Sequence, residues 1–415
     1  GRKNWADFIL FIDADVVLTN ENTFLYLTNN TNGMVVIAPM LYSLGTYSNF
    51  WAGITKNGYY KRTDDYLPIL ERQNVGQFQV PMIHSCIFVN LRHKLSNYLT
   101  FDGRQLSDNL PFDDIISFAK SAELGSIPLY IDNREVWGYI PPPIDNNSRL
   151  NSLQQDLIDL ELESLVEGPS FPISNSLFSY ILTYPKDKLN VDNIYMINLE
   201  RRFERRNRML KCFDLLGIEV QIWPAIDGKL LSFDKIKSKG IKLMENYLDP
   251  YHKRPMTFGE IGCFLSHYEI WQDIIKRNFS NAIIFEDDVR FERNLKYKWK
   301  KAFSSLNTNE YDFVYLGRKR QGDNESQIGN FFVTPSYSYW TLGYFITAKG
   351  AQKLLDAKPL EKLIPVDEFL PIMYDSHPTQ EWISHFTNRN LKALSIDPLL
   401  IFPTHYVGDS LYISD

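Results

Sequence analysis

The sequence has little cysteine. It contains 3 cysteines in 415 residues, Cys86, Cys212 and Cys263. They are odd in number, widely spaced and free of any Cys-x-x-Cys pattern, so neither a disulfide framework nor a zinc cluster is indicated. The cysteines alone leave the redox compartment open.

The sequence also lacks a long hydrophobic run and an excess of basic residues. Its apolar runs have the length of strands and are interrupted by charge, which excludes a transmembrane helix within this sequence. The net charge is -6 and the pI is about 5.7. An acidic balance argues against nucleic acid as a partner, although local basic clusters can still bind phosphate.

The length predicts two domains. A chain of 415 residues, 44% hydrophobic and 23% charged, exceeds one ordinary domain and can fill two cores. Gly1-Arg2-Lys3 precede a strand by only a few residues, and the chain ends at Tyr412-Ile413-Ser414-Asp415. We expect a truncation at the N-terminus and a cut at the C-terminus.

Two apolar runs each end in a cluster of acids. Residues 8–12 lead into Asp13-Ala14-Asp15, and residues 282–285 lead into Glu286-Asp287-Asp288. Short continuous apolar runs indicate strands buried on both faces, and open α/β sheets bind ligands at the carboxyl ends of such strands. Aspartates at that edge are suited to a hard divalent cation, which in turn can hold a diphosphate. The pattern predicts nucleotide-sugar chemistry in both halves of the chain.

A run of prolines marks a domain boundary in the chain. Three prolines at 141–143 can continue neither a helix nor a central strand. We therefore expect an N-terminal domain over 1–143, a linker over 144–190 and a C-terminal domain over 191–415. The linker contains leucines at helical spacing, which predict an amphipathic helix over 151–167.

The C-terminal domain alternates strand and helix patterns. Strands are expected over 193–199, 219–223, 282–285 and 313–316, with a basic helix after the first and a long helix over 257–276. Such alternation predicts a mostly parallel α/β sheet.

Several motifs carry a family resemblance that spans nearly the whole chain. In the first half these are Tyr47-Ser48-Asn49-Phe50-Trp51 and Gly58-Tyr59-Tyr60-Lys61-Arg62-Thr63; in the second half they are residues 194–199 with the following arginines, 249–252, 257–267, 285–288, 317–320, 338–342, 365–371 and 403–406. Together they resemble glycosyltransferase family 25, and within it the animal branch that galactosylates procollagen.

The resemblance implies two GT-A-like, Rossmann-like domains in tandem, the first truncated at its N-terminus. It implies inverting transfer of galactose from UDP-galactose to hydroxylysine in collagen or procollagen, with Mn²⁺, in the lumen of the endoplasmic reticulum. The retention tail expected of the family is absent from this sequence. Four Asn-x-Ser/Thr sequons, at Asn29, Asn146, Asn278 and Asn324, are compatible with a secretory glycoprotein. The alternative is a catalytically silent relative that acts in adhesion or collagen binding, and a homodimer is left open.

The acid clusters supply the predicted metal ligands. Asp288 and Glu286 face one side of the strand end and are expected to bind the metal directly or through ribose and water. Alternation points Asp287 away from that side, and it is a candidate only for binding the nucleotide sugar. Asp13 and Asp15 are the corresponding ligands of the first domain. The ordinary alternative for both clusters is capping of a loop.

Two histidines have different expectations. His405 follows a strand-like segment and, given the resemblance, is a further metal ligand; otherwise it is a packed or surface residue. His267 lies on the apolar helix over 257–276, where a buried core imidazole is the expected role.

Basic residues after two strands are candidate phosphate ligands. Arg201 and Arg202 follow the first strand of the C-terminal domain, and Arg318 and Lys319, with Arg320, follow a later one. The alternative is a solvated helix face in the first case and a solubilising loop in the second.

An inverting transfer requires a general base for the acceptor hydroxyl. Asp367 and Glu368 are the leading candidates, with helix N-terminal charge as their alternative role. In the first domain the acid pair Asp113-Asp114 also precedes apolar residues and is the candidate base of that domain. Trp340 is a candidate sugar or acceptor platform, or else a core aromatic residue.

Overall fold

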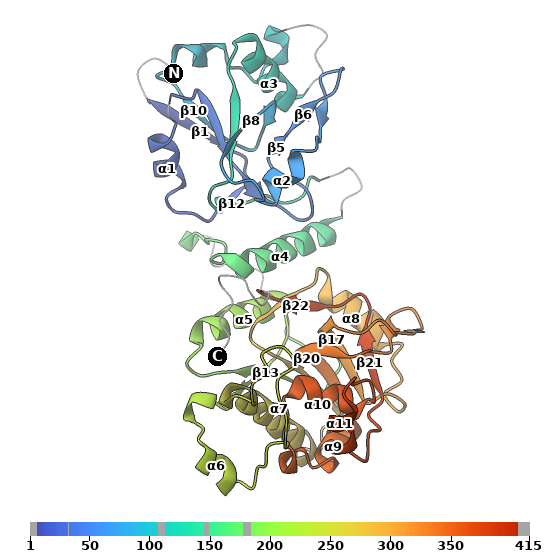
Figure 1. The fold of residues 1–415 in the computed structure, drawn as a ribbon. Helices are drawn as coiled ribbons and strands as arrows, with labels where there is room; N and C mark the ends of the chain where they lie inside the picture. Colours follow the sequence, from blue (N-terminus) through green and yellow to red (C-terminus); the bar gives the residue numbers. More distant parts are fainter. Residues whose placement is uncertain (1–5, 32, 107–112, 145–148, 177–183, 406–415) are drawn as a thin grey trace. The chain divides into compact units, whose positions relative to one another are not determined.

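The computed structural model describes residues 6–31, 33–106, 113–144, 149–176 and 184–405, and the chain divides into two compact units, 1–180 and 181–415 (Figure 1). Gly1-Arg2-Lys3, the sequon at Asn146 and the segment 412–415 lie outside the described residues. Among the described helices, none has both the length and the apolar character needed to span a membrane.

The first unit is built on a five-stranded sheet. Three of its four pairings are antiparallel. The first strand lies at the edge and is half exposed, so the expectation that it is buried on both faces is wrong: only one neighbour covers it. The order is β1 (Phe8–Ile12), β10 (Cys86–Asn90), β3 (Val36–Pro39), β11 (Leu129–Asp132) and β8 (Gln77–Val80).

Smaller elements complete the first unit. A three-stranded sheet and two short strand pairs accompany the main sheet, together with helices. Helix α4 (Leu150–Glu167) covers the range 151–167, for which the leucine spacing predicts a helix. The elements are β2 (Val17–Leu18), β12 (Gly138–Tyr139), β4 (Leu41–Tyr42), β5 (Phe50–Trp51), β9 (Met82–Ile83), β6 (Gly53–Ile54), β7 (Tyr60–Lys61), α1 (Thr23–Asn29), α2 (Tyr66–Leu70), α3 (Asp114–Leu124) and α4 (Leu150–Glu167), with 3₁₀ turns at Lys94–Tyr98 and Gly103–Gln105.

The second unit is built on an eight-stranded sheet. Its order is β14 (Gln221–Pro224), β13 (Asn193–Asn198), β15 (Asn281–Phe285), β20 (Ser338–Thr347), β17 (Phe313–Arg320), β21 (Ala393–Ile396), β19 (Phe332–Val333) and β18 (Gln327–Ile328). A separate pair joins β16 (Val289–Phe291) to β22 (Ile401–Pro403).

The prediction of a mostly parallel sheet is wrong. Strand β13 is parallel to β14 and β15, and β17 is parallel to β21, but β20 is antiparallel to both β15 and β17. Strand β17 reaches β20 through a loop and the short strands β18 and β19 instead of a crossover helix, so the chain returns in the opposite direction. The fold is therefore a mixed α/β sheet.

Helices cover both faces of this sheet, as Figure 1 shows. On one face α7 (Phe258–Lys276), α9 (Ala348–Asp356) and α10 (Val366–Met373) pack with inward side chains such as Tyr315 and Tyr344 in the largest core. On the other, α5 (Phe203–Leu216) and α8 (Leu295–Phe303) bring Phe213 against Phe285 and Trp299 against Phe345. The remaining helices are α6 (Phe233–Ser238) and α11 (Gln380–Ser384), with 3₁₀ turns at Gly228–Leu230 and Pro359–Glu361.

Candidate active site

A pocket lies at the carboxyl ends of the parallel strands β13, β14 and β15. Its volume is about 430 Å³, which suits a nucleotide-sized ligand. The acid cluster after β15 and the arginines after β13 share this pocket, as the sequence predicts for a sheet of this kind. The lining residues include Leu199, Arg201, Arg202, Arg205, Asp227, Lys229, Phe258, Glu260, Cys263, Ser266, His267, Glu286, Asp287 and Asp288.

Close packing fixes one wall of the pocket. A Cβ added to Gly262 would lie 2.3 Å from the carbonyl oxygen of Ile226, so only glycine lets α7 approach that loop. The Ser266 hydroxyl accepts a hydrogen bond from the Ile226 backbone N–H at 2.9 Å. A capping box between Thr257 and Glu260 starts α7 beside the same wall.

The three acids after β15 have different environments. The Glu286 carboxylate accepts hydrogen bonds from Thr341 at 2.6 Å and from His267 at 3.4 Å. Burial alone would raise the pKa of Glu286, but these two hydrogen bonds hold it below its usual value. Burial, and then the charge of Glu286, raises the pKa of Asp288 to about 6. One oxygen of Asp288, Oδ1, is buried without a partner among the described residues.

Asp287 is held by the protein itself. It is buried, and its two oxygens accept hydrogen bonds from Asn198 at 2.6 Å and from Arg205 at 3.3 Å. Its carboxylate therefore joins β13 and α5 to the end of β15. The oxygens of Glu286 and Asp288 are consequently better placed than those of Asp287 for a cation in the pocket.

The arginines after β13 line the same pocket. Arg201 pairs with Asp227 at 2.8 Å and keeps a third of its side chain exposed, while Arg202 is half-buried at the start of α5. Arg205, which was not singled out from the sequence, pairs with both Asp287 and Asp288 at 3.3 Å. The pocket thus places carboxylate and guanidinium side chains within reach of one ligand.

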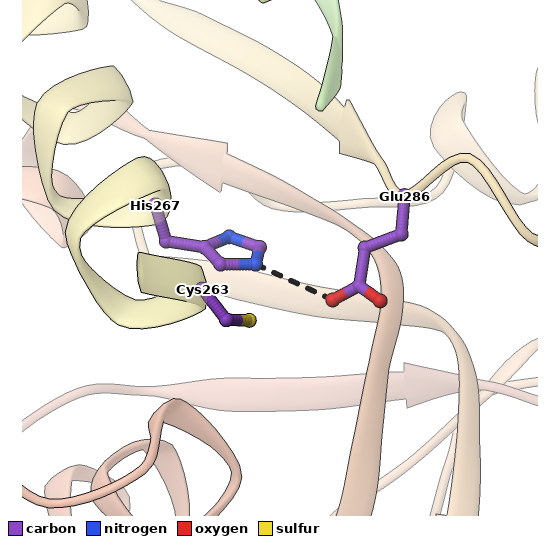
Figure 2. A group of neighbouring side chains, drawn as sticks. All are labelled: Cys263, His267 and Glu286. Carbon is purple, nitrogen blue, oxygen red and sulfur yellow. Dashed lines mark hydrogen bonds and ion pairs between the residues drawn. The ribbon is translucent and has the colours of Figure 1, made fainter. Parts of the chain in front are cut away.

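Helix α7 contributes two groups that the sequence analysis did not assign to the site. Cys263 and His267 lie one turn apart on α7 and face Glu286 at the end of β15, as Figure 2 shows. One ligand atom from each of the three lies within 4.8 Å of the others. His267 is fully buried, as expected, yet its ring also forms part of the pocket. The Cys-x-x-x-His spacing on a helix was the available signal.

Asp367 lies near Glu286 at the start of α10. Burial, and then the charge of Glu286, raises its pKa to about 7, although hydrogen bonds from the Trp340 backbone and the Thr341 hydroxyl lower it. Its Oδ1 is buried without a partner among the described residues. Trp340 has φ 66, an uncommon conformation for a bulky residue. This conformation accompanies the contact of its backbone with Asp367.

Glu368, the other candidate base, is saturated by protein contacts. It is 2% exposed and accepts hydrogen bonds from Tyr339 at 2.6 Å, Tyr337 at 2.8 Å and His377 at 2.8 Å. His377 accepts from the Thr379 backbone N–H through Nδ1, so its proton is on Nε2 and points at Glu368. The Glu368 carboxylate is thus engaged by three donors, whereas Asp367 keeps one oxygen without a partner among the described residues.

The second basic cluster lies apart from this pocket. Arg318 is buried and makes four hydrogen bonds, to Ser395, Ser338 and both oxygens of Glu325. It therefore has a structural role here, and a contact with a diphosphate gains no support. Lys319 lies 5.1 Å from the ring of Trp340, and both line a second cavity of about 310 Å³.

His405 follows a segment that is tied to the acid cluster. The backbone N–H and the hydroxyl of the preceding Thr404 both donate to the carbonyl oxygen of Asp288, at 2.7 and 2.9 Å. The structure thus brings this part of the chain to the acid cluster. Within the described residues, His405 is not one of the three side chains grouped around a potential cation.

In the first unit the acid pair lies at the exposed end of β1. Asp13 and Asp15 are exposed, and the Asp13 backbone N–H donates to the Ser85 carbonyl oxygen at 2.8 Å. Nearby, burial lowers the pKa of His84 to about 4, and its Nε2 has no partner among the described residues. Asp113 caps α3 by accepting from Ile116 at 2.9 Å, which is its ordinary alternative role. No group of three potential ligand residues forms there among the described residues.

The acids and arginines of this mixed α/β sheet lie at the carboxyl ends of its parallel strands, where open α/β sheets bind their ligands. Two family profiles match the chain: "Glycosyltransferase family 25, N-terminal domain" over residues 1–161 and "Glycosyltransferase family 25 (LPS biosynthesis protein)" over 191–331. The chain belongs to glycosyltransferase family 25 and is a glycosyltransferase.

Similar proteins are found in insects and vertebrates. A glycosyltransferase 25 family member of Aedes aegypti is 48% identical over the whole chain and 69% of its own length. Procollagen galactosyltransferase 1 of Danio rerio is 43% identical, covering the whole chain and 69% of the relative. Procollagen galactosyltransferase 2 of Homo sapiens is 44% identical, covering the whole chain and 67% of the relative.

Proposed function

We propose that the second unit transfers galactose from UDP-galactose to hydroxylysine in collagen or procollagen, with inversion at the anomeric carbon. The observation that carries this proposal is the pocket that Glu286 and Asp288 line together with Arg201 and Arg202. The names of the zebrafish and human relatives support galactose as the sugar and procollagen as the acceptor.

The donor diphosphate would lie between the acids and the arginines. The oxygen-rich pair Glu286 and Asp288 suits a hard cation such as Mn²⁺, and the unpartnered Oδ1 of Asp288 is an observation in its favour. When bound, Mn²⁺ would neutralise the diphosphate and the departing UDP. Arg201 and Arg202 would hold the phosphate oxygens by charge-assisted hydrogen bonds.

Asp367 would act as the general base. Its carboxylate accepts the proton of the hydroxylysine hydroxyl while the new bond to the anomeric carbon forms and the bond to UDP breaks. A pKa of about 7 leaves a large ionised fraction at neutral pH and a carboxylate basic enough to accept the proton. Glu368, held by three donors, would keep α10 and hence Asp367 in place.

The location and assembly are further parts of the proposal. A collagen-modifying enzyme of this kind would work in the lumen of the endoplasmic reticulum, where procollagen chains are still unfolded. The sequons at Asn29, Asn278 and Asn324 would then be available for glycosylation. A homodimer is compatible with this function and is not required by the pocket.

The test is transfer of labelled galactose from UDP-galactose to a hydroxylysine-containing collagen peptide, with and without Mn²⁺. We expect Mn²⁺-dependent transfer, and no transfer to the same peptide with lysine in place of hydroxylysine. UDP-glucose in parallel tests the sugar. Binding of UDP and Mn²⁺ without any transfer would contradict the proposal and favour a catalytically silent protein that acts in adhesion or collagen binding.

A further inference from the structure

The group of Cys263, His267 and Glu286 differs chemically from an all-oxygen cation site. It offers a sulfur, a nitrogen and a carboxylate oxygen, whose mutual distances are all within 4.8 Å. Sulfur and imidazole ligands favour zinc and similar borderline metals over manganese or magnesium. This donor set therefore points to a different class of cation from the one proposed for the donor diphosphate.

The distances suit a tetrahedral metal. His267 Nε2 and Glu286 Oε1 are 3.4 Å apart. Zinc bonds of about 2.0–2.2 Å to nitrogen and oxygen, set at the tetrahedral angle, place two such ligands roughly 3.4 Å apart. The Cys263 sulfur lies within 4.8 Å of both of these atoms and supplies the third ligand. The three ligands line the pocket, so a fourth position would face the space where a water or a ligand can enter.

The histidine is held as a metal-binding histidine usually is. Its Nδ1 lies 2.9 Å from the Tyr344 hydroxyl, and that hydroxyl accepts a hydrogen bond from the Trp271 indole at 2.9 Å. His267, Tyr344 and Trp271 are all fully buried. Such outer partners hold the ring in its orientation, which is a common feature of zinc sites.

The surrounding charge favours a cation. The carboxyl groups of Glu286, Asp367 and Asp288 all lie near the Cys263 thiol. Asp288 and Asp367 each carry one buried oxygen that has no partner in the described part of the chain. A divalent cation would compensate these acids and allow the thiol to release its proton to solvent.

We propose that Cys263, His267 and Glu286 form a binding site for Zn²⁺ or a similar thiophilic divalent cation. On binding, the Cys263 thiol proton is released to solvent, and the His267 ring proton moves from Nε2, where it points at Glu286, to Nδ1, where it faces the Tyr344 oxygen, so that Nε2 supplies its lone pair to the cation. Because Glu286 belongs also to the proposed Mn²⁺ ligands, the two cations exclude each other. Zn²⁺ thus inhibits transfer, a consequence that rests on the proposed function, whereas the binding itself does not.

The experiment is a titration of the full chain with Co²⁺, followed by absorption spectroscopy. A thiolate ligand gives a strong near-ultraviolet charge-transfer band that oxygen ligands do not give. We expect one Co²⁺ per chain with this band, its loss on addition of Zn²⁺, and its absence in Cys263→Ser. The matched control is Cys212→Ser, a buried cysteine of α5, which retains the band.

Two outcomes would overturn the proposal: no charge-transfer band in the parent protein, or an undiminished band in Cys263→Ser. If Cys263→Ser fails to fold, the rate of alkylation of Cys263 in the parent protein is measured with and without Zn²⁺. We expect bound Zn²⁺ to slow this rate at least tenfold. Equal rates with and without Zn²⁺ would contradict the site. These readouts need neither donor nor acceptor, so they separate this proposal from a failure of galactose transfer.

Discussion

Asp367 combines burial with a neighbouring negative charge, and both act against its ionised form. These two effects place its pKa at about 7, well above the usual value of 3.8. The sequence marked Asp367 and Glu368 as an acid pair at a helix start, but it could not distinguish them. The distinction depends on Tyr337, Tyr339 and His377, which reach Glu368 from other parts of the chain.

We predict that Asp367→Asn lowers the turnover number by roughly 10²–10⁴-fold, because the amide cannot accept the hydroxyl proton. UDP binding, measured by calorimetry, should change little. In the parent protein, kcat/KM should rise with pH up to about 7, since only the ionised carboxylate is a base. A cation bound near Glu286 would lower the pKa of Asp367, and the rise of kcat/KM would then occur at lower pH. Full activity of Asp367→Asn would exclude Asp367 as the base.

Asp367 should lower the stability of the folded protein, so Asp367→Asn should be more stable although it is less active. Its pKa is about 7 in the folded protein and near 3.8 when unfolded, so ionisation opposes folding progressively as pH rises from 4 toward 7. Asp367→Asn should therefore raise the Tm of the metal-free protein by a few degrees at pH 8 and by almost nothing at pH 4. A Tm that is unchanged at pH 8 would show that the carboxylate is not destabilised by its surroundings.

Arg318 and Glu325 form a buried ion pair with side chains 5% and 6% exposed. We predict that Arg318→Ala costs about 3–5 kcal/mol of unfolding free energy, because it leaves the Glu325 carboxylate buried without its main partner. Despite burial, Arg318 holds the pKa of Glu325 at about 2, so this stabilisation is present above about pH 4.5 and is lost as pH falls toward 2.

Urea unfolding at pH 7 measures this cost. The control is Arg320→Ala, because the Arg320 side chain is 53% exposed and approaches the same Glu325 carboxylate only at 3.5 Å. We expect the control to lose less than about 1 kcal/mol, as an exposed ion pair does. Equal losses in the two variants would show that burial does not set the strength of the Arg318 pair.

At the scale of elements, the local signals succeeded where one segment determines its own structure. The helix expected over 257–276 is α7 (Phe258–Lys276), with the capping box of Thr257 and Glu260 at its start. Strand β15 (Asn281–Phe285), which leads into Glu286, was likewise predicted. Strand β20 (Ser338–Thr347) was missed because its polar and aromatic first half has no strand pattern, and its insertion between β15 and β17 is a long-range choice. The sheet is mixed for that reason.

Helix α7 forms the pocket wall only because Gly262 permits its close approach to Ile226. We predict that Gly262→Ala raises the KM for the sugar donor roughly tenfold, and lowers stability by about 1–3 kcal/mol, since its Cβ would lie 2.3 Å from the Ile226 oxygen. Gln272→Ala, on the exposed face of α7, is the matched control. Equal KM values for Gly262→Ala and the parent would show that this wall does not shape the donor site.

At the scale of the whole molecule, the chain consists of two units that each carry an acid-tipped strand. Only the second combines its acids with arginines, a candidate base and a large pocket among the described residues. The sequence predicted both acid clusters and already placed the metal, phosphate and base candidates together in the C-terminal domain. The difference arises because β1 lies at the edge of its sheet, whereas β15 lies inside a sheet flanked by β13 and β20.

The central claim is that galactose transfer takes place in the pocket of the second unit. The most direct measurement compares Mn²⁺-dependent transfer from UDP-galactose to a hydroxylysine-containing collagen peptide in the parent protein, Asp288→Ala and Asp15→Ala. We predict that Asp288→Ala abolishes transfer while Asp15→Ala, when folded, retains it. Transfer that survives in Asp288→Ala and is lost in a folded Asp15→Ala would contradict the account and place catalysis in the first unit.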